Sequence, residues 1–235
     1  MVSDGQVDGH YYQVAKPDSV GERLAAVARD SIYRDFLRLA RPTPASSILD
    51  VGVSDVVGEA ANVLERKYPH LDRVTAVGLG TAHQFQSEFP QVAYRRIVAG
   101  EPLPFPDRSF DIATSNAVLE HVGSTEAQVA FVAELARVAQ CAFISVPHRF
   151  FPVEHHTMIP LLHWKDSSFA ITCRILGKQE WADPANLILM TRRRLRQLCP
   201  DQSARIGTTG IRMGPLSSNL YMLIGEPGER PTSMH

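Results

Sequence analysis

The chain has 235 residues, of which 44% are hydrophobic and 21% charged, and its formal net charge is −1 at pH 7. This length and composition predict one sizeable α/β domain with a buried core. The charge balance argues against nucleic-acid binding, which needs a broad basic surface. The one basic cluster, Arg192-Arg193-Arg194 with Arg196, is interpreted as a solvated helix face.

Residues 1–17 are expected to form a loose polar leader, since they lack the apolar stretch of a signal peptide. A helix is predicted next, over residues 19–40, because its apolar positions recur at intervals of three and four. Ser19 and Glu22 have the spacing of a capping box at its start, and Pro42 and Pro44 end it.

Short apolar strands then alternate with helices. Strands are predicted over 46–52, 73–80, 92–99, 110–118 and 141–147, and helices over 56–68, 82–89 and 125–140, the last opened by Ser124 or Thr125. This alternation implies parallel β-α-β units with helices on both faces of the sheet.

The pattern breaks over residues 148–190, where "HRFFPVEHHTMIPLLHW" is aromatic, His-rich and interrupted by prolines. We interpret this segment as a helical or loop insert after the fifth strand. A helix over 191–199 and two strands over 203–213 and 218–226 follow, and these strands are expected to pair as an antiparallel hairpin. Residues 18–226 are thus predicted to form a single domain, followed by a disordered tail over 227–235.

The predicted fold class is therefore α/β, with a doubly wound, Rossmann-like, mostly parallel seven-stranded sheet and a C-terminal antiparallel hairpin. In such open sheets, ligands bind outside the carboxyl ends of the strands. Three segments expected near these strand ends follow one another along the chain: "DVG" at 50–52, "LPFPDRSFD" at 103–111 and "SNAVLEHV" at 115–122.

These segments and the closing hairpin resemble the class I S-adenosylmethionine-dependent methyltransferases, most closely their small-molecule, type-11-like branch. The resemblance runs from about residue 46 to residue 226. It implies S-adenosylmethionine as the cofactor and methyl transfer to a small-molecule acceptor, such as a sugar-bearing compound or a secondary metabolite.

The resemblance also implies that Asp50 and Gly52 begin the cofactor loop, with Val53 and Ser54 following them. Gly52 lets the backbone approach the ligand, because no side chain blocks it. Asp50 would fix this loop or meet the amino-acid end of the cofactor through water; capping a turn is the alternative. The family's loop reads acidic-x-Gly-x-Gly-x-Gly, whereas this chain keeps the first glycine and has Ser54 and Val56 at the next two positions.

The adenosine side departs from the family pattern as well. Gly78 and Leu79 end the second strand, where the family has an acidic residue for the ribose hydroxyls. Gly100 and Glu101 follow the third strand, and Glu101 either reaches the adenine or is a solvated loop charge. After the fourth strand, the expected cofactor contacts are Asn116 and Ala117.

Three residues are predicted on the acceptor side as catalytic candidates: His148, His121 and Glu154. His148 follows the fifth strand directly, so it is expected to face the ligand crevice, and a histidine that titrates near neutrality suits a general base. The alternatives are that His121 anchors a loop against the following helix and that His148 is a hydrogen-bonded turn residue.

Glu154, His155 and His156, with His148 and His163 nearby, are residue types that ligate zinc or iron. Residues adjacent in sequence point in different directions, however, and the segment has no spaced H-x-x-x-H motif. The sequence therefore predicts no metal site.

The degenerate loop leaves a second hypothesis open, a non-catalytic relative that uses the fold as a binding or assembly module. A nicotinamide-dependent oxidoreductase is disfavoured, because "GVSDVVG" lacks the G-x-G-x-x-G spacing. Three scattered cysteines without a disulfide pattern and no run of 18 apolar residues predict a soluble cytoplasmic protein that does not enter membranes. The oligomeric state stays open, with a homodimer among the options.

Overall fold

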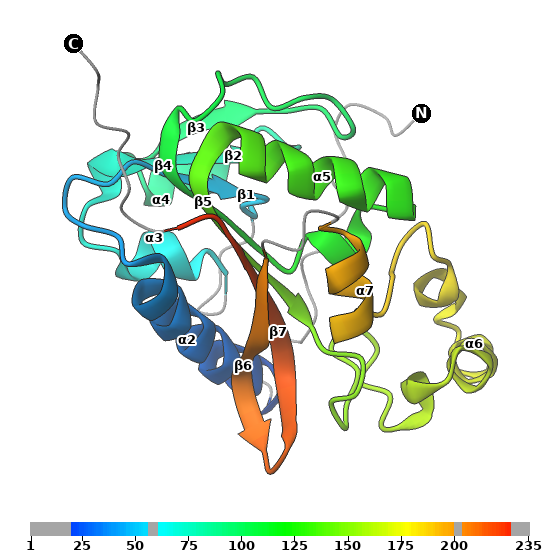
Figure 1. Cartoon of the computed structure of the whole chain (residues 1–235). Helices are drawn as coiled ribbons and strands as arrows, with labels where there is room; N and C mark the ends of the chain where they lie inside the picture. Colours follow the sequence, from blue (N-terminus) through cyan, green and yellow to red (C-terminus); the bar gives the residue numbers. More distant parts are fainter. Residues whose placement is uncertain (1–19, 56–60, 200–203, 227–235) are drawn as a thin grey trace.

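The computed structural model describes residues 20–55, 61–199 and 204–226, with side chains from residue 23 onward (Figure 1). Four features expected from the sequence lie wholly or partly outside these residues. They are the polar leader, the capping box of Ser19 and Glu22, the first part of the helix expected over 56–68, and the C-terminal tail. The first described helix is α2 (Val20–Ala40).

Seven strands form one sheet in the order β3-β2-β1-β4-β5-β7-β6. The first five run parallel, whereas β7 is antiparallel to both β5 and β6. This arrangement confirms the predicted doubly wound sheet and its C-terminal hairpin. The strands are β1 (Ile48–Val51), β2 (Val74–Gly78), β3 (Ala93–Arg96), β4 (Phe110–Asn116), β5 (Ala139–Pro147), β6 (Arg205–Met213) and β7 (Leu216–Ile224).

Helices cover both faces of this sheet (Figure 1). The remaining α-helices are α3 (Val63–Lys67), α4 (His83–Glu88), α5 (Thr125–Val138), α6 (Asp166–Ile175) and α7 (Arg192–Gln197). Short 3₁₀ turns are η1 (Leu71–Arg73), η2 (Leu119–His121), η3 (Leu162–Trp164) and η4 (Gln179–Ala182). No helix among the described residues is long and apolar enough to cross a membrane.

Each face of the sheet has its own hydrophobic core, because neighbouring side chains of a strand point to opposite faces. Residues of α2, α3 and α4 pack with Ile48 and Phe143 on one face. Residues of α5 and α7 pack with Leu49 and Ile144 on the other. Fully burying one such side chain stabilises the fold by about 1.5–3 kcal/mol.

The boundary between α5 and β5 differs from the sequence-based prediction. The helix expected to run to residue 140 ends at Val138, and β5 begins at Ala139 rather than at 141. Ala139 pairs with Phe110 of β4, so a buried strand ladder takes the place of the last helical residues. At the other end of α5, Ser124 is the N-cap, as expected, and its side chain accepts a hydrogen bond from Ala127 N at 3.2 Å.

The insert over 148–190 carries α6, η3 and η4, which surround a small core of their own. Ile159, Phe169, Cys173 and Leu187 form this core. The insert returns to the sheet beside its starting point, since His148 and Met190 form a parallel bridge. That residues 18–226 form a single domain stays a prediction.

Candidate functional site

A concave feature lies where β1, β4 and β5 end, under helix α2. We call it the α2 hollow; it encloses about 580 Å³, part of it open to solvent. The carboxyl ends of parallel strands and the start of α3 form its floor. This is the place at which open α/β sheets bind ligands.

Helix α2 forms the roof of the α2 hollow with one face. Arg29, Ile32, Tyr33 and Phe36 all line it, and their spacing of three, four and seven residues brings them to one side of a helix. Phe36 also packs edge-on against Phe143 of β5, with ring centroids 5.7 Å apart. The roof is therefore apolar except for the Arg29 guanidinium and the Tyr33 hydroxyl.

Asp50, at the end of β1, faces a second acid that the sequence reasoning missed, Glu65 of α3. Burial raises the pKa of Asp50 to about 7, although a hydrogen bond from Glu65 opposes this rise. Burial and the Asp50 charge together raise the pKa of Glu65 well above its usual value. No hydrogen-bond donor elsewhere in the described chain reaches the Glu65 oxygens. The two carboxyls therefore share a proton near neutral pH.

Gly52 occupies the position that the sequence assigned to it in the turn after β1. Its φ is +99°, and a Cβ on this residue would overlap the Cγ2 atom of Val118. The backbone N–H groups of Gly52 and Val53 both donate to the Val77 carbonyl, at 2.8 and 3.2 Å. Gly52 and Val53 line the α2 hollow, but these two N–H groups already have an acceptor in β2.

The rest of this loop is tied to two helices. Ser54 N donates to Asn62 Oδ1 at 3.0 Å, and Asn62 Nδ2 donates back to the Ser54 carbonyl at 2.8 Å. Asp55 Oδ1 accepts a hydrogen bond from Phe85 N at 2.9 Å, within the first turn of α4. Side-chain contacts thus hold the loop where the family pattern uses glycines.

The four residues expected at the adenosine end do not line the α2 hollow. Leu79 is 38% exposed, and Gly100 and Glu101 are exposed. Gly78 is buried under Tyr94, whose hydroxyl donates to the Gly80 carbonyl at 2.6 Å. Among the described residues, no carboxylate from the ends of β2 and β3 enters the hollow.

Asn116, at the end of β4, does line the α2 hollow, and its orientation is fixed by β5. The Ser145 hydroxyl donates to Asn116 Oδ1, and Ala117 N donates to the Ser145 carbonyl at 2.9 Å. Ala117 has a φ of +57°, which is uncommon for a residue with a side chain. Such backbone outliers concentrate at functional sites.

A second, smaller cavity of about 250 Å³ lies between the sheet and the insert; we call it the insert cavity. It contains His148, whose Nδ1 lies 3.2 Å from the Ser217 carbonyl. Burial lowers the pKa of His148, which leaves its ring neutral and able to accept a proton at pH 7. His148 faces this cavity, and it is not among the residues that line the α2 hollow.

Glu154 also lines the insert cavity, but its carboxylate is fully engaged. It accepts hydrogen bonds from His156 N and Nδ1, both at 2.9 Å, and from Thr157 N and Oγ1, at 2.6 and 2.7 Å. Burial by itself raises the pKa of Glu154, yet the His156 charge and these hydrogen bonds outweigh it and hold the pKa well below its usual value. Glu154 is thus arranged to hold a turn rather than to take a proton from a substrate.

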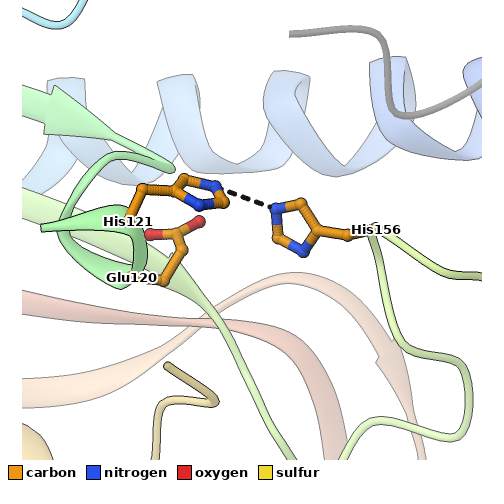
Figure 2. Close-up of side chains that lie close together, drawn as sticks. All are labelled: Glu120, His121 and His156. Atoms are coloured by element: carbon orange, nitrogen blue, oxygen red, sulfur yellow. Dashed lines mark hydrogen bonds between the residues drawn. The ribbon is translucent and has the colours of Figure 1, made fainter. Parts of the chain in front are cut away.

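His121 lies in η2, directly after β4, and meets His156 of the insert (Figure 2). Its Nδ1 is 2.7 Å from the Asn186 carbonyl, and its Nε2 is 3.1 Å from His156 Nε2. Burial lowers the pKa of His121 to about 4. Glu120, which the sequence reasoning did not consider, is buried beside them, and burial raises its pKa to about 7.

Residues 49–141 match a family model described as a methyltransferase domain. No curated protein matches the chain. Among solved structures, the magnesium protoporphyrin IX methyltransferase from Synechocystis PCC 6803 with bound SAH is similar, with a TM-score of 0.58 and 14% identity over 91% of each chain. A SAM-dependent methyltransferase from Aquifex aeolicus has a TM-score of 0.55 and 16% identity, over 91% of this chain and 98% of that one.

A complex of the Haloferax volcanii Trm112 methyltransferase activator with a methyltransferase is similar too. Its TM-score is 0.56, with 12% identity over 94% of this chain and 95% of that one. At such identities a structural likeness shows the fold alone. Together with the family-model match, the shared fold confirms the resemblance to methyltransferases that the sequence motifs predicted.

Proposed function

We propose that the chain, which has the class I methyltransferase fold, is an S-adenosylmethionine-dependent methyltransferase acting on a small-molecule acceptor. The observation that carries this proposal is the α2 hollow, which has Asp50, backed by Glu65, in its floor and Arg29 in its roof. The amino-acid end of the cofactor carries an ammonium and a carboxylate, so it needs groups of both charges.

The charge pattern of the α2 hollow supports an assignment of roles. Asp50 receives the ammonium, because a cation nearby favours the ionised carboxyl and displaces the proton shared with Glu65. Arg29 receives the carboxylate through its guanidinium fork, which suits paired hydrogen bonds to two oxygens. Gly52 and Asn116 border the same space, so the backbone and an amide side chain complete the walls.

Fewer of the described residues are placed to bind the adenosine part of the cofactor. Each absent charge-assisted hydrogen bond costs about 1.5–3 kcal/mol of binding, so two of them weaken the affinity by about two to four orders of magnitude. The sequence-based contacts Gly78, Leu79, Gly100 and Glu101 remain proposals for this end. We therefore expect a dissociation constant of about 10 μM to 1 mM for the cofactor product.

The bound cofactor supplies an electrophilic methyl group on a sulfonium. The chain's task is then to align the acceptor and to keep water away. Ile32 and Phe36 of the roof exclude water from the hollow, and the Ala117 turn fixes Asn116 at its edge. Where the acceptor keeps a proton that must leave, His148 is the proposed base, because its ring is neutral and lines the insert cavity.

Calorimetric titration with S-adenosylhomocysteine tests the proposal. The expected result is one site per chain, weakened at least tenfold by Asp50→Asn and by Arg29→Gln. Arg34→Gln is the matched control, because Arg34 lies on the same helix and is exposed. If the wild-type protein binds no S-adenosylhomocysteine at millimolar concentration, the proposal that S-adenosylmethionine is the cofactor is wrong.

One observation favours a second candidate, a methyltransferase-like binding or assembly protein without catalysis. Polar groups of residues 52–55, the described part of the loop after β1, are already paired with Val77, Asn62 and Phe85. A loop of this kind holds its shape without a ligand. Against this reading, the exposed Leu79 side chain does not fill the α2 hollow. Turnover of any acceptor, or binding in the same titration, decides against it.

A further inference from the structure

The two histidines in Figure 2 present the same ring atom to one another. The Asn186 carbonyl can only accept a hydrogen bond, so His121 Nδ1, at 2.7 Å from it, carries a hydrogen. His156 Nδ1 lies 2.9 Å from the Glu154 carboxylate, so it carries a hydrogen as well. In their neutral forms, both rings therefore direct a lone pair on Nε2 into a gap of 3.1 Å.

Glu120 supplies a third acceptor to the same point. Its side chain is 1% exposed, and neither of its carboxyl oxygens has a hydrogen-bond partner among the described residues. Ligand atoms of Glu120, His121 and His156 all lie within 4.8 Å of one another. Three acceptors that converge on one point, two of them buried, are costly unless a proton or a metal ion lies among them.

We propose that Glu120, His121 and His156 bind one divalent transition-metal ion, with Zn²⁺ as the best match. Two imidazole nitrogens and one carboxylate are a common protein ligand set for zinc, with one coordination position left for water. Nitrogens about 2.05 Å from a tetrahedral ion lie about 3.3 Å apart, close to the spacing of the two Nε2 atoms. The Glu120 carboxylate would be the third ligand.

The surroundings of this cluster resemble those of known metal ligands in one respect. A ligating histidine almost always donates its other ring N–H to a carboxylate or a backbone carbonyl. His156 donates to Glu154 and His121 to Asn186. Trp181 packs against both rings, with centroids 5.1 Å from His156 and 6.3 Å from His121.

A proton in the same gap is the competing occupant. It would join the two Nε2 atoms in one hydrogen bond and make His156 an imidazolium beside Glu154. That arrangement leaves both oxygens of Glu120 without a hydrogen bond and offers them only the nearby charges of His156 and Arg29, whereas a metal ion engages all three side chains. The carboxyl of Glu120 therefore favours the ion.

The ion would join two parts of the fold that are distant in sequence. Glu120 and His121 belong to η2, four to five residues after Asn116, and His156 belongs to the insert. A bound metal would thus fasten the insert to the turn beside the α2 hollow. This inference goes beyond the proposed function and does not depend on it.

The test uses the full chain, free of any polyhistidine tag and treated with a chelator. Zn²⁺ is titrated by calorimetry, and Co²⁺ is titrated by visible absorption, which reports tetrahedral coordination. Glu120→Gln keeps the shape of the side chain and removes the charged ligand, and His156→Asn removes a ligand nitrogen. The matched controls are Glu126→Gln, at an exposed acid, and His70→Asn, at a histidine outside the cluster.

We expect one Zn²⁺ per chain and a tetrahedral Co²⁺ spectrum for the wild-type protein and both controls. Glu120→Gln and His156→Asn should lose the spectrum, and Glu154→Gln should weaken binding about 10–100-fold, because it only orients His156. Circular dichroism separates loss of the ligand from loss of the fold. Binding no tighter than millimolar, or equal binding by folded Glu120→Gln, overturns the proposal and leaves a protonated histidine pair.

Discussion

The carboxyl of Asp50, in the floor of the α2 hollow, faces the buried carboxyl of Glu65, and both have a raised pKa. Asp50 comes from the end of β1 and Glu65 from the short helix α3, so the pair joins the sheet to the helix that covers it. Near neutral pH this pair holds a proton that a cationic ligand can displace.

The stabilisation that the Asp50–Glu65 pair contributes should fall as the pH rises toward neutrality. Because the pKa of Asp50 rises from 3.8 to about 7 on folding, the folded state holds a proton that the unfolded state has lost. The resulting stabilisation is present below about pH 4 and disappears as the pH rises through about 7. Between pH 5 and pH 8 the pair should therefore contribute a loss of melting temperature, in addition to the titration of buried groups such as His121 that every variant shares.

In Glu65→Gln the neutral amide replaces the shared proton, so this loss should be smaller by about 3 °C or more. Glu126→Gln is the control, since Glu126 is fully exposed and its substitution leaves the acid pair intact. Parallel curves for the wild-type protein and Glu65→Gln would show that the pair does not titrate between these pH values.

The affinity for S-adenosylhomocysteine should increase with pH over the same range. The proposed ammonium contact requires ionised Asp50, so below about pH 7 binding must also release a proton. We expect the dissociation constant to rise up to tenfold for each pH unit below 7. Calorimetry in two buffers of different ionisation enthalpy measures the released proton, and Asp50→Asn should abolish both effects. Binding that is independent of pH in the wild-type protein contradicts this contact.

Gly52→Ala should destabilise the protein by about 2–4 kcal/mol, because the new Cβ collides with Val118 in addition to opposing a positive φ. Gly177→Ala is the matched control, with a φ of +66° and no atom within 4 Å of its Cβ position. It should cost about 1 kcal/mol. Val118→Ala in the Gly52→Ala background should restore part of the difference, and denaturant unfolding measures all three variants.

Arg137→Lys should loosen the segment over 103–107, which contains part of the motif before β4. The Arg137 guanidinium donates to the Leu103 and Phe105 carbonyls, to Asp107 and to Glu134. A lysine cannot reproduce this fork, so we expect a loss of about 1–2 kcal/mol. Arg38→Lys, at an exposed pair with Asp35, should cost less than about 0.5 kcal/mol. Equal losses in the two variants would contradict the role of the fork.

Periodicity and motif order were enough to predict the sheet, the closing hairpin and the insert. Alternating apolar strands and helices dictate parallel crossovers, and the absence of a helix between β6 and β7 dictates their hairpin. The end of α5 was predicted wrongly, because the pairing of Ala139 with Phe110 is a long-range contact that no local pattern contains.

The sites were harder to predict, because their residues come from separate segments. Asp50, Gly52, Val53 and Asn116 were expected at a ligand site and do line the α2 hollow. Arg29 was not predicted as a site residue. Its spacing from Ile32 and Phe36 places it on the same face of a helix, so a charged residue on an apolar face was a signal in the sequence. Glu65 and Glu120 gave no local signal, since only tertiary packing brings them to Asp50 and to the two histidines.

We expected no metal site because His155 and His156 are adjacent in sequence, and their side chains do point apart. His155 packs near Phe151, whereas His156 turns toward His121. The cluster that the structure assembles takes one member from the insert and two from the turn after β4. Sequence spacing could not indicate it, because 35 residues separate the two histidines.

The most direct test of the central claim is a crystal structure of the protein with S-adenosylhomocysteine. The account predicts the ligand in the α2 hollow, with its ammonium at Asp50 and its carboxylate at Arg29. A ligand bound elsewhere, or a hollow that stays without it at saturating concentration, would contradict the proposed function.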